Sequence, residues 1–80
     1  MNNRRQNVRT RTARPARIVY DYRSVVACTI CDLSPDGAGL EVSIFVPVPD
    51  TFDLITERDD DARTCRVIWR TTNRMGVWFR

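Results

Sequence analysis

Apolar and polar side chains alternate along most of the chain from residue 16 onward. In the clearest case, Cys65, Val67 and Trp69 would face one way, with arginines and an isoleucine between and after them. A period of two is typical of β-strands, whose successive side chains point to opposite faces. No segment longer than ten residues shows the 3.6-residue period of a helix. The pattern predicts strands over residues 16–22, 25–33, 39–45, 51–57, 65–70 and 75–79.

Turn-forming residues separate these predicted strands. Residues 34–37 read Ser-Pro-Asp-Gly, prolines interrupt the chain at 47 and 49, and residues 58–61 predict a charged hairpin tip. Short strands in a chain of 80 residues favour one closed barrel, because closure removes exposed strand edges. We therefore expect an all-β fold, a small antiparallel six-stranded β-barrel over residues 16–80, preceded by a flexible arm over residues 1–15.

The charge distribution sets the arm apart from the barrel. All thirteen basic residues are arginine. Residues 1–17 hold six of them and no acid, whereas residues 18–80 hold seven arginines and ten acids. A basic arm on a mildly acidic body predicts an anionic ligand, because the planar guanidinium suits phosphate oxygens and the O6/N7 edge of guanine. Arg11, Arg14 and Arg17 receive no specific role from the pattern.

The residue inventory argues against catalysis. There is no histidine, so the usual general base and the commonest neutral metal ligand are missing. A chain this short also leaves little interior for a supported active site. We expect no enzyme activity, no metal and no resident cofactor. Without an apolar leader or a membrane-length apolar run, we expect a cytoplasmic chain that does not bind membranes and keeps its cysteines reduced.

Several side chains that suggest chemistry have simpler interpretations. Cys28 and Cys31 form a CxxC pair inside a predicted strand, where a spacing of three puts them on opposite faces, so we interpret them, with Cys65, as packing residues. The aspartates at 59–61 lack the ligand spacing of a calcium loop and are interpreted as a solvated tip. We expect Trp69 and Phe79 in the core, with Trp78 on the face opposite Phe79.

Two short motifs carry the functional prediction. Arg5 and Arg9 form an RxxxR pattern with Arg4 directly before it, and Asp32, Ser34 and Gly37 form a DxSxxG pattern at a strand end. Each alone is weak evidence. In this order, on an all-β chain of this size, the sequence resembles the PilZ domain family, the cyclic di-GMP receptor module of bacteria. The resemblance runs almost the full length, and neither motif departs from the family pattern.

The resemblance implies a role for each motif residue. Arg5 and Arg9 would clamp phosphates, read guanine or stack on a purine. Asp32 would accept hydrogen bonds from guanine N1–H and N2–H₂, and Ser34 would bond a phosphate or a base edge. Gly37 would supply positive φ or close approach of backbone to ligand. Arg4 implies two stacked cyclic di-GMP molecules per chain. We expect no output domain in a receptor of this size, so we also expect it to act on an unidentified protein effector.

Two other functions remain open at this point. The first is a single-stranded nucleic-acid-binding barrel, for which an arginine-rich arm and aromatic strands would be suitable. The acidic body argues against it, and so does the expectation that no sheet face interleaves basic and aromatic residues. The second is a PilZ-like adaptor that binds protein and not nucleotide. Adaptors of that kind usually lack one of the two motifs, and this chain has both.

Overall fold

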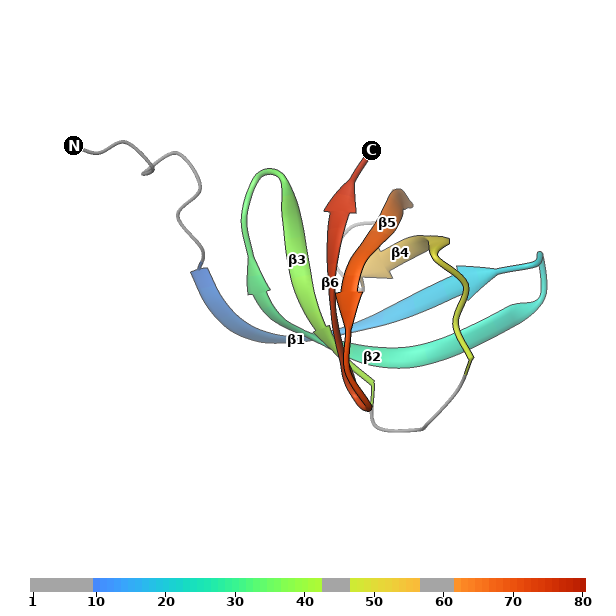
Figure 1. The fold of residues 1–80 in the computed structure, drawn as a ribbon, viewed down its shortest axis with the longest axis horizontal. Helices are drawn as coiled ribbons and strands as arrows, with labels where there is room; N and C mark the ends of the chain where they lie inside the picture. The colour runs from blue at the N-terminus through green and yellow to red at the C-terminus, as the bar shows by residue number, and fades with distance from the viewer. Residues whose placement is uncertain (1–9, 43–46, 57–61) are drawn as a thin grey trace.

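The fold is a single closed barrel of six antiparallel strands (Figure 1), seen in a computed structural model that describes residues 10–42, 47–56 and 62–80. Around the barrel the strands follow the order β1-β2-β3-β6-β5-β4. Their bounds are β1 (Thr10–Tyr20), β2 (Ser24–Leu33), β3 (Gly37–Glu41), β4 (Thr51–Thr56), β5 (Arg63–Arg70) and β6 (Arg74–Phe79). The predicted all-β, six-stranded architecture is confirmed. None of the described residues belongs to a helix that could cross a membrane.

The inward side chains of all six strands meet in one core. The largest fully buried side chains of this core are those of Ile18, Ile30, Leu40, Cys65 and Val77. Phe79 packs against this cluster, as predicted, and so do four other partly buried apolar side chains. Among the described residues no polar or charged side chain is buried. Polar chemistry in the described part of the chain is therefore confined to the outside of the barrel and its ends.

Strand β1 begins earlier than the sequence predicted. Residues 10–15, assigned to the arm, belong to β1, and Thr10 pairs with Leu33 of β2. Two threonines here favour extended backbone, and the long β2 provides a partner for them. Pro15 is tolerated because β1 pairs with β4 only from Ala16 onward, so one edge of the strand has no partner strand there among the described residues. The rest of the predicted arm, residues 1–9, lies outside the described residues.

The β1–β2 hairpin ends in a tight turn that the alternation did not predict. Tyr22 was expected on the same face as Ile18, but it is fully exposed and has a φ of 65°. Asp21 before it has a φ of 58°, and the Arg23 N–H donates to the Asp21 carbonyl at 2.7 Å. The left-handed turn interrupts the strand before Tyr22, so its side chain leaves the core face.

The segment between β3 and β4 is attached to the barrel by one arginine. The Arg70 guanidinium donates to the Val48 carbonyl and to the Asp50 carboxylate, both at 2.7 Å. Val48 itself is buried in the core, and the Val67 N–H donates to the Asp50 carbonyl. Arg70 is thus a structural residue and is occupied within the fold. The predicted acidic tip at 58–61 lies outside the described residues.

Candidate ligand-binding site

The DxSxxG residues lie where β2 turns into β3, on the side of the barrel where β1 begins (Figure 1). The Ser34 N–H donates to the Gly37 carbonyl at 2.9 Å, and the Gly37 N–H donates to the Ser34 hydroxyl at 3.2 Å. The same hydroxyl donates back to the Gly37 carbonyl at 3.3 Å. Ser34 therefore closes the turn. Its remaining lone pair is suited to accept from a base N–H, whereas donating to a phosphate would break its bond to Gly37.

Two reasons for a glycine at position 37 were predicted, a positive φ or a close approach of backbone to ligand. No glycine in the described residues has a positive φ, so the expectation of positive φ at Gly37 is wrong. Gly37 pairs with Trp78 across β3 and β6, and a Cβ at position 37 would overlap the carbonyl oxygen of Val77. The close approach is thus between two strands, and backbone atoms leave no room for any side chain at position 37.

Two β-bulges turn the side chains of Asp32 and Trp69 to the outside of the barrel. In β2, Ile30 pairs with Leu40 and Asp32 with Gly39, so Cys31 is the extra residue. The register between β5 and β6 also shifts, where Ile68 is the extra residue. Without these insertions, strict alternation would place Asp32 on the face of Ile30. Bulges of this kind often re-aim a side chain beside a functional site.

The two bulges lie at the same level of the barrel and produce one row of residues across four strands. Asp32 pairs with Gly39, Gly39 with Gly76, and Gly76 with Trp69. We call these four residues the glycine row. The Asp32 Oδ2 atom lies 2.7 Å from where a Cβ at position 39 would be, and Trp69 Cε2 lies 2.6 Å from one at position 76. A carboxylate and an indole thus cover a floor of glycine backbone.

The row borders a small hollow of about 80 Å³. Its lining consists of Cys31, Asp32, Gly39, Leu40, Trp69, Arg74 and Met75. At roughly 30 Å³ per water, this volume holds two or three water molecules and is too small for a nucleotide. A nucleotide on this site would therefore lie across the outside of the barrel and insert at most the edge of one base.

Trp69 is a site residue that the alternation pattern concealed. It was predicted to lie in the core, but its side chain is 47% exposed because the bulge at Ile68 reverses the alternation. The available signal was Gly76 and Gly39, since glycine inside a strand often marks a bulge or a close approach. Trp78, in contrast, lies on the outer face as predicted, opposite in direction to Phe79.

Of the three cysteines, only Cys31 borders the site, as part of the lining of the small hollow. Cys28 is in the core and Cys31 is only partly buried, in agreement with opposite faces for the CxxC pair. Burial raises the pKa of Cys28 to about 12, with smaller contributions from Cys65 and Cys31, and burial also raises that of Cys65 to about 11. Both thiols are protonated at neutral pH, and protonated thiols are poor metal ligands. The described ranges contain no group of three or more cysteine or acidic side chains placed to hold a metal ion.

The RxxxR motif, with Arg4, Arg5 and Arg9, lies outside the described residues. The part of β1 that follows it is described, and Arg11 pairs with Asp32 across β1 and β2. Registered cross-strand partners have Cβ atoms roughly 5 Å apart on the same face. The chain therefore enters the barrel directly beside the DxSxxG motif, with opposite charges on neighbouring strands.

Comparison with known proteins gives one clear result. The family model described as PilZ domain matches residues 3–80, which include both motifs and all six strands. No curated protein matches the chain. PilZ domains are receptors for cyclic di-GMP that commonly interact with protein effectors, and they are binding modules and not generally enzymes. With nearly every residue matched, the chain belongs to the PilZ domain family.

Proposed function

We propose that the chain is a receptor for cyclic di-GMP, which binds across the glycine row and is held by the N-terminal arginines. The observation that carries this proposal is the pair of bulges that turns Asp32 and Trp69 outward at one level of the barrel. Without the bulges, strict alternation would put Asp32 and Trp69 on the core face of their strands. The arrangement gives a base acceptor and a flat stacking surface at the two ends of a backbone floor.

Asp32 is the residue that would select guanine. Its carboxylate accepts two hydrogen bonds at once from guanine N1–H and N2–H₂, a donor pair that adenine lacks. Because positions 39 and 76 carry no side chain, the Asp32 carboxylate and the Trp69 indole can lie close against the backbone of the row. Trp69 offers a π-face for the base, and such stacking contributes about 1–3 kcal/mol of binding free energy. Ser34 holds the turn that presents Asp32, and Gly37 holds the turn against β6.

The arginines would supply the charge that two phosphates require. Arg9 is two residues before Arg11, so its Cα is within about 7 Å of that of Arg11, and Arg5 is within about 20 Å. Since Arg11 pairs with Asp32, both arginines of RxxxR are within reach of a ligand on the glycine row. Arg4 would neutralise a second, stacked ligand molecule. We expect affinity on the order of micromolar.

Titration calorimetry with purified protein tests the proposal. We expect saturable binding of cyclic di-GMP at two molecules per chain, with no binding of cyclic di-AMP or GTP under the same conditions. Arg9→Ala should remove roughly 2–5 kcal/mol of binding free energy. Arg23→Ala is the matched control, because Arg23 is an exposed arginine in the β1–β2 turn. Equal affinity for the adenine dinucleotide would refute the role of Asp32, and a one-to-one complex would refute that of Arg4.

A further inference from the structure

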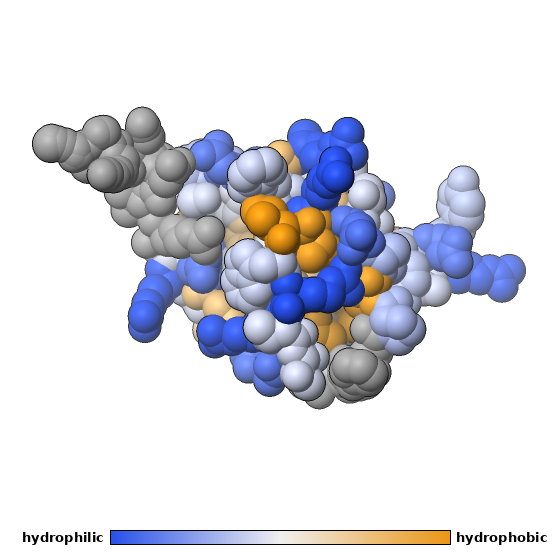
Figure 2. Space-filling model, in the orientation of Figure 1, coloured by the Kyte–Doolittle hydropathy of each residue, from blue (hydrophilic) through white to orange (hydrophobic). Residues whose placement is uncertain are grey.

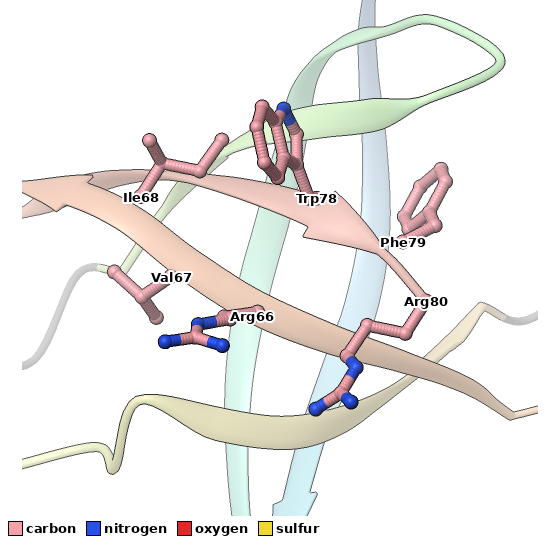
Figure 3. A pocket seen from close by; sticks show the side chains of 6 residues that line it. All are labelled: Arg66, Val67, Ile68, Trp78, Phe79 and Arg80. Atoms are coloured by element: carbon pink, nitrogen blue, oxygen red, sulfur yellow. The ribbon is translucent and has the colours of Figure 1, made fainter.

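A second hollow over the described strands is larger than the one at the glycine row. A groove of about 420 Å³ lies on the outside of β5 and β6, lined by Arg66, Val67, Ile68, Trp78, Phe79 and Arg80. We call it the β5–β6 groove. Arg66 and Trp78 are registered partners across the two strands. Figure 3 shows the Ile68 and Trp78 side chains next to each other, the Arg80 side chain extending toward β4, and the Arg66 side chain lying beside Val67.

Two large apolar side chains of the groove are exposed to solvent and do not contribute to the core. Trp78 is 59% exposed and Ile68 is 49% exposed. Figure 2 shows apolar side chains gathered in the middle of this face of the barrel, surrounded by hydrophilic ones. Exposed apolar patches with a polar rim mark interaction sites. Tryptophan and arginine are the residue types that contribute most at protein interfaces.

The arginines of the groove are available for a partner. Within the described residues, neither the Arg66 nor the Arg80 side chain forms an ion pair or a hydrogen bond, whereas Arg70 is paired with Asp50. A third arginine, Arg63, lies 4.5 Å over the Phe79 ring. Residues 18–80 as a whole carry more acids than arginines. The groove is thus a basic and apolar patch on an acidic body, contrary to the expectation that no sheet face combines basic and aromatic residues.

The groove adjoins the candidate ligand site along β6. Trp78 pairs with Gly37 of the DxSxxG turn, and the Phe79 N–H donates to the Asp36 carbonyl at 2.8 Å. Gly76 of the glycine row precedes Trp78 by two residues on the same strand. The β2–β3 turn of the candidate ligand site is therefore joined by backbone contacts to the strand that carries Trp78 and Phe79 of the groove.

We propose that the β5–β6 groove docks an acidic segment of a partner protein that carries an aromatic or large aliphatic side chain. The apolar side chain of the partner would cover Ile68 and Trp78, and its carboxylates would pair with Arg66 and Arg80. A protein segment suits the groove better than a nucleic acid, because residues 18–80 carry ten acids against seven arginines and would repel a phosphate backbone, and because aliphatic Val67 and Ile68 line the groove beside its aromatic residues. The proposal does not depend on nucleotide binding.

A selection experiment tests this docking surface. The purified chain is used to select from a displayed library of random twelve-residue peptides, and an enriched peptide is then titrated by fluorescence anisotropy. We expect the enriched peptides to combine Asp or Glu with aromatic or large aliphatic residues. Arg66→Glu and Trp78→Ala should each weaken the selected peptide at least about tenfold, as expected for truncation of an interface hot spot.

Matched controls come from the turn of the β1–β2 hairpin. Arg23→Glu and Tyr22→Ala change an exposed arginine and an exposed aromatic there, and peptide affinity should stay within about twofold. Enriched peptides without acidic residues, or peptides that bind Arg66→Glu and Trp78→Ala as well as wild type, would overturn the proposal. So would a twelve-nucleotide oligo-dT that binds and is lost with Trp78→Ala while no peptide is enriched.

The ligand site and the groove can fail independently. Cyclic di-GMP should bind Arg66→Glu as it binds wild type, which also shows that the variant is folded. Absence of cyclic di-GMP binding to wild type would refute the proposed function and leave the peptide result standing. Should Arg66→Glu unfold, Arg66→Gln removes the charge with less disturbance and carries the same expectation.

Discussion

The glycine row and the β5–β6 groove lie on neighbouring levels of the same strands and are built in opposite ways. At the row, two glycines and two bulges bring backbone to the surface and fold one carboxylate and one indole over it. At the groove, regular alternation along β6 leaves large side chains standing outward above a much larger hollow. A backbone floor fixes distances and therefore suits recognition of one small ligand. A patch of exposed apolar and arginine side chains adapts to a partner surface.

The largest expected effect comes from filling the space beside either region with a single methyl group. Gly37→Ala places a Cβ against the Val77 carbonyl, which belongs to a paired strand and has no room to move, so we expect a loss of about 3 kcal/mol in the free energy of unfolding. Gly76→Ala meets only the Trp69 side chain, which can rotate away. Urea denaturation measures both variants.

The contrast between these two glycine variants is the informative result. Gly76→Ala should lose less than half as much stability as Gly37→Ala, and it should weaken cyclic di-GMP by displacing Trp69 from the row. Equal destabilisation by both variants would mean that Trp69 is as fixed as a backbone atom. The inference that the Trp69 side chain can move away from Gly76 would then be wrong.

The two exposed tryptophans separate the regions directly. Trp69→Ala should weaken cyclic di-GMP by about 1–3 kcal/mol and leave the selected peptide unaffected, because Trp69 ends the glycine row. Trp78→Ala should weaken the peptide much more than the nucleotide, because Trp78 lines the groove and contributes no side chain to the glycine row. Calorimetry and anisotropy on the same two variants give the full comparison. If both variants lost both ligands equally, the row and the groove would be one site.

Much of this fold was predictable from the sequence, because strands and turns leave local patterns: alternating apolar and polar residues in the strands and turn-forming residues between them. Alternation predicted all six strands, although β1 begins six residues earlier than predicted and β3 ends at Glu41 before the predicted limit of 45, and Ser34 to Gly37 marked the β2–β3 turn. The early start of β1 was missed because residues 10–15 have few apolar side chains. What makes them a strand is the partner that β2 provides, and pairing with a distant segment leaves no local pattern.

Which side chains face outward was harder to predict, because a single bulged residue reverses the alternation of inward and outward side chains in the rest of the strand. The pattern Cys65, Val67, Trp69 predicted a buried tryptophan, and the bulge at Ile68 put its indole on the surface. Asp32 was identified as a site residue from the motif, but its place over Gly39 depends on the bulge at Cys31. The partner residues Gly39 and Gly76 come from two other strands, and only the register brings them together.

The two buried cysteines of the core should make the barrel less stable at alkaline pH. The pKa of Cys28 is raised by burial from its ordinary 9.0 to about 12, and that of Cys65 to about 11. Between about pH 9 and 11 the unfolded chain therefore releases thiol protons that the folded chain keeps, so the free energy of unfolding falls as pH rises. Urea denaturation from pH 7 to 11 measures the slope.

Substitutions of the cysteines identify the source of that slope. A Cys28→Ala, Cys65→Ala double variant should lose much of the alkaline decline, whereas Cys31→Ala should keep it. A thiol reagent at pH 8 should modify partly exposed Cys31 first and the two buried thiols only on unfolding. Rapid modification of all three in the folded chain would show that the barrel opens readily, and neither region would then rest on a rigid base.

The smallest expected effect lies at the β1–β2 turn, away from both regions. Tyr22 is fully exposed with a φ of 65°, where a bulky side chain is disfavoured and asparagine is accepted. Tyr22→Asn should therefore raise the free energy of unfolding by about 0.5–1 kcal/mol. Cyclic di-GMP and peptide affinities should both stay unchanged, because the hairpin tip contributes to neither the row nor the groove. A stabilised barrel with altered affinity for either ligand would mean that the two regions respond to the rigidity of the whole fold and not only to their own side chains.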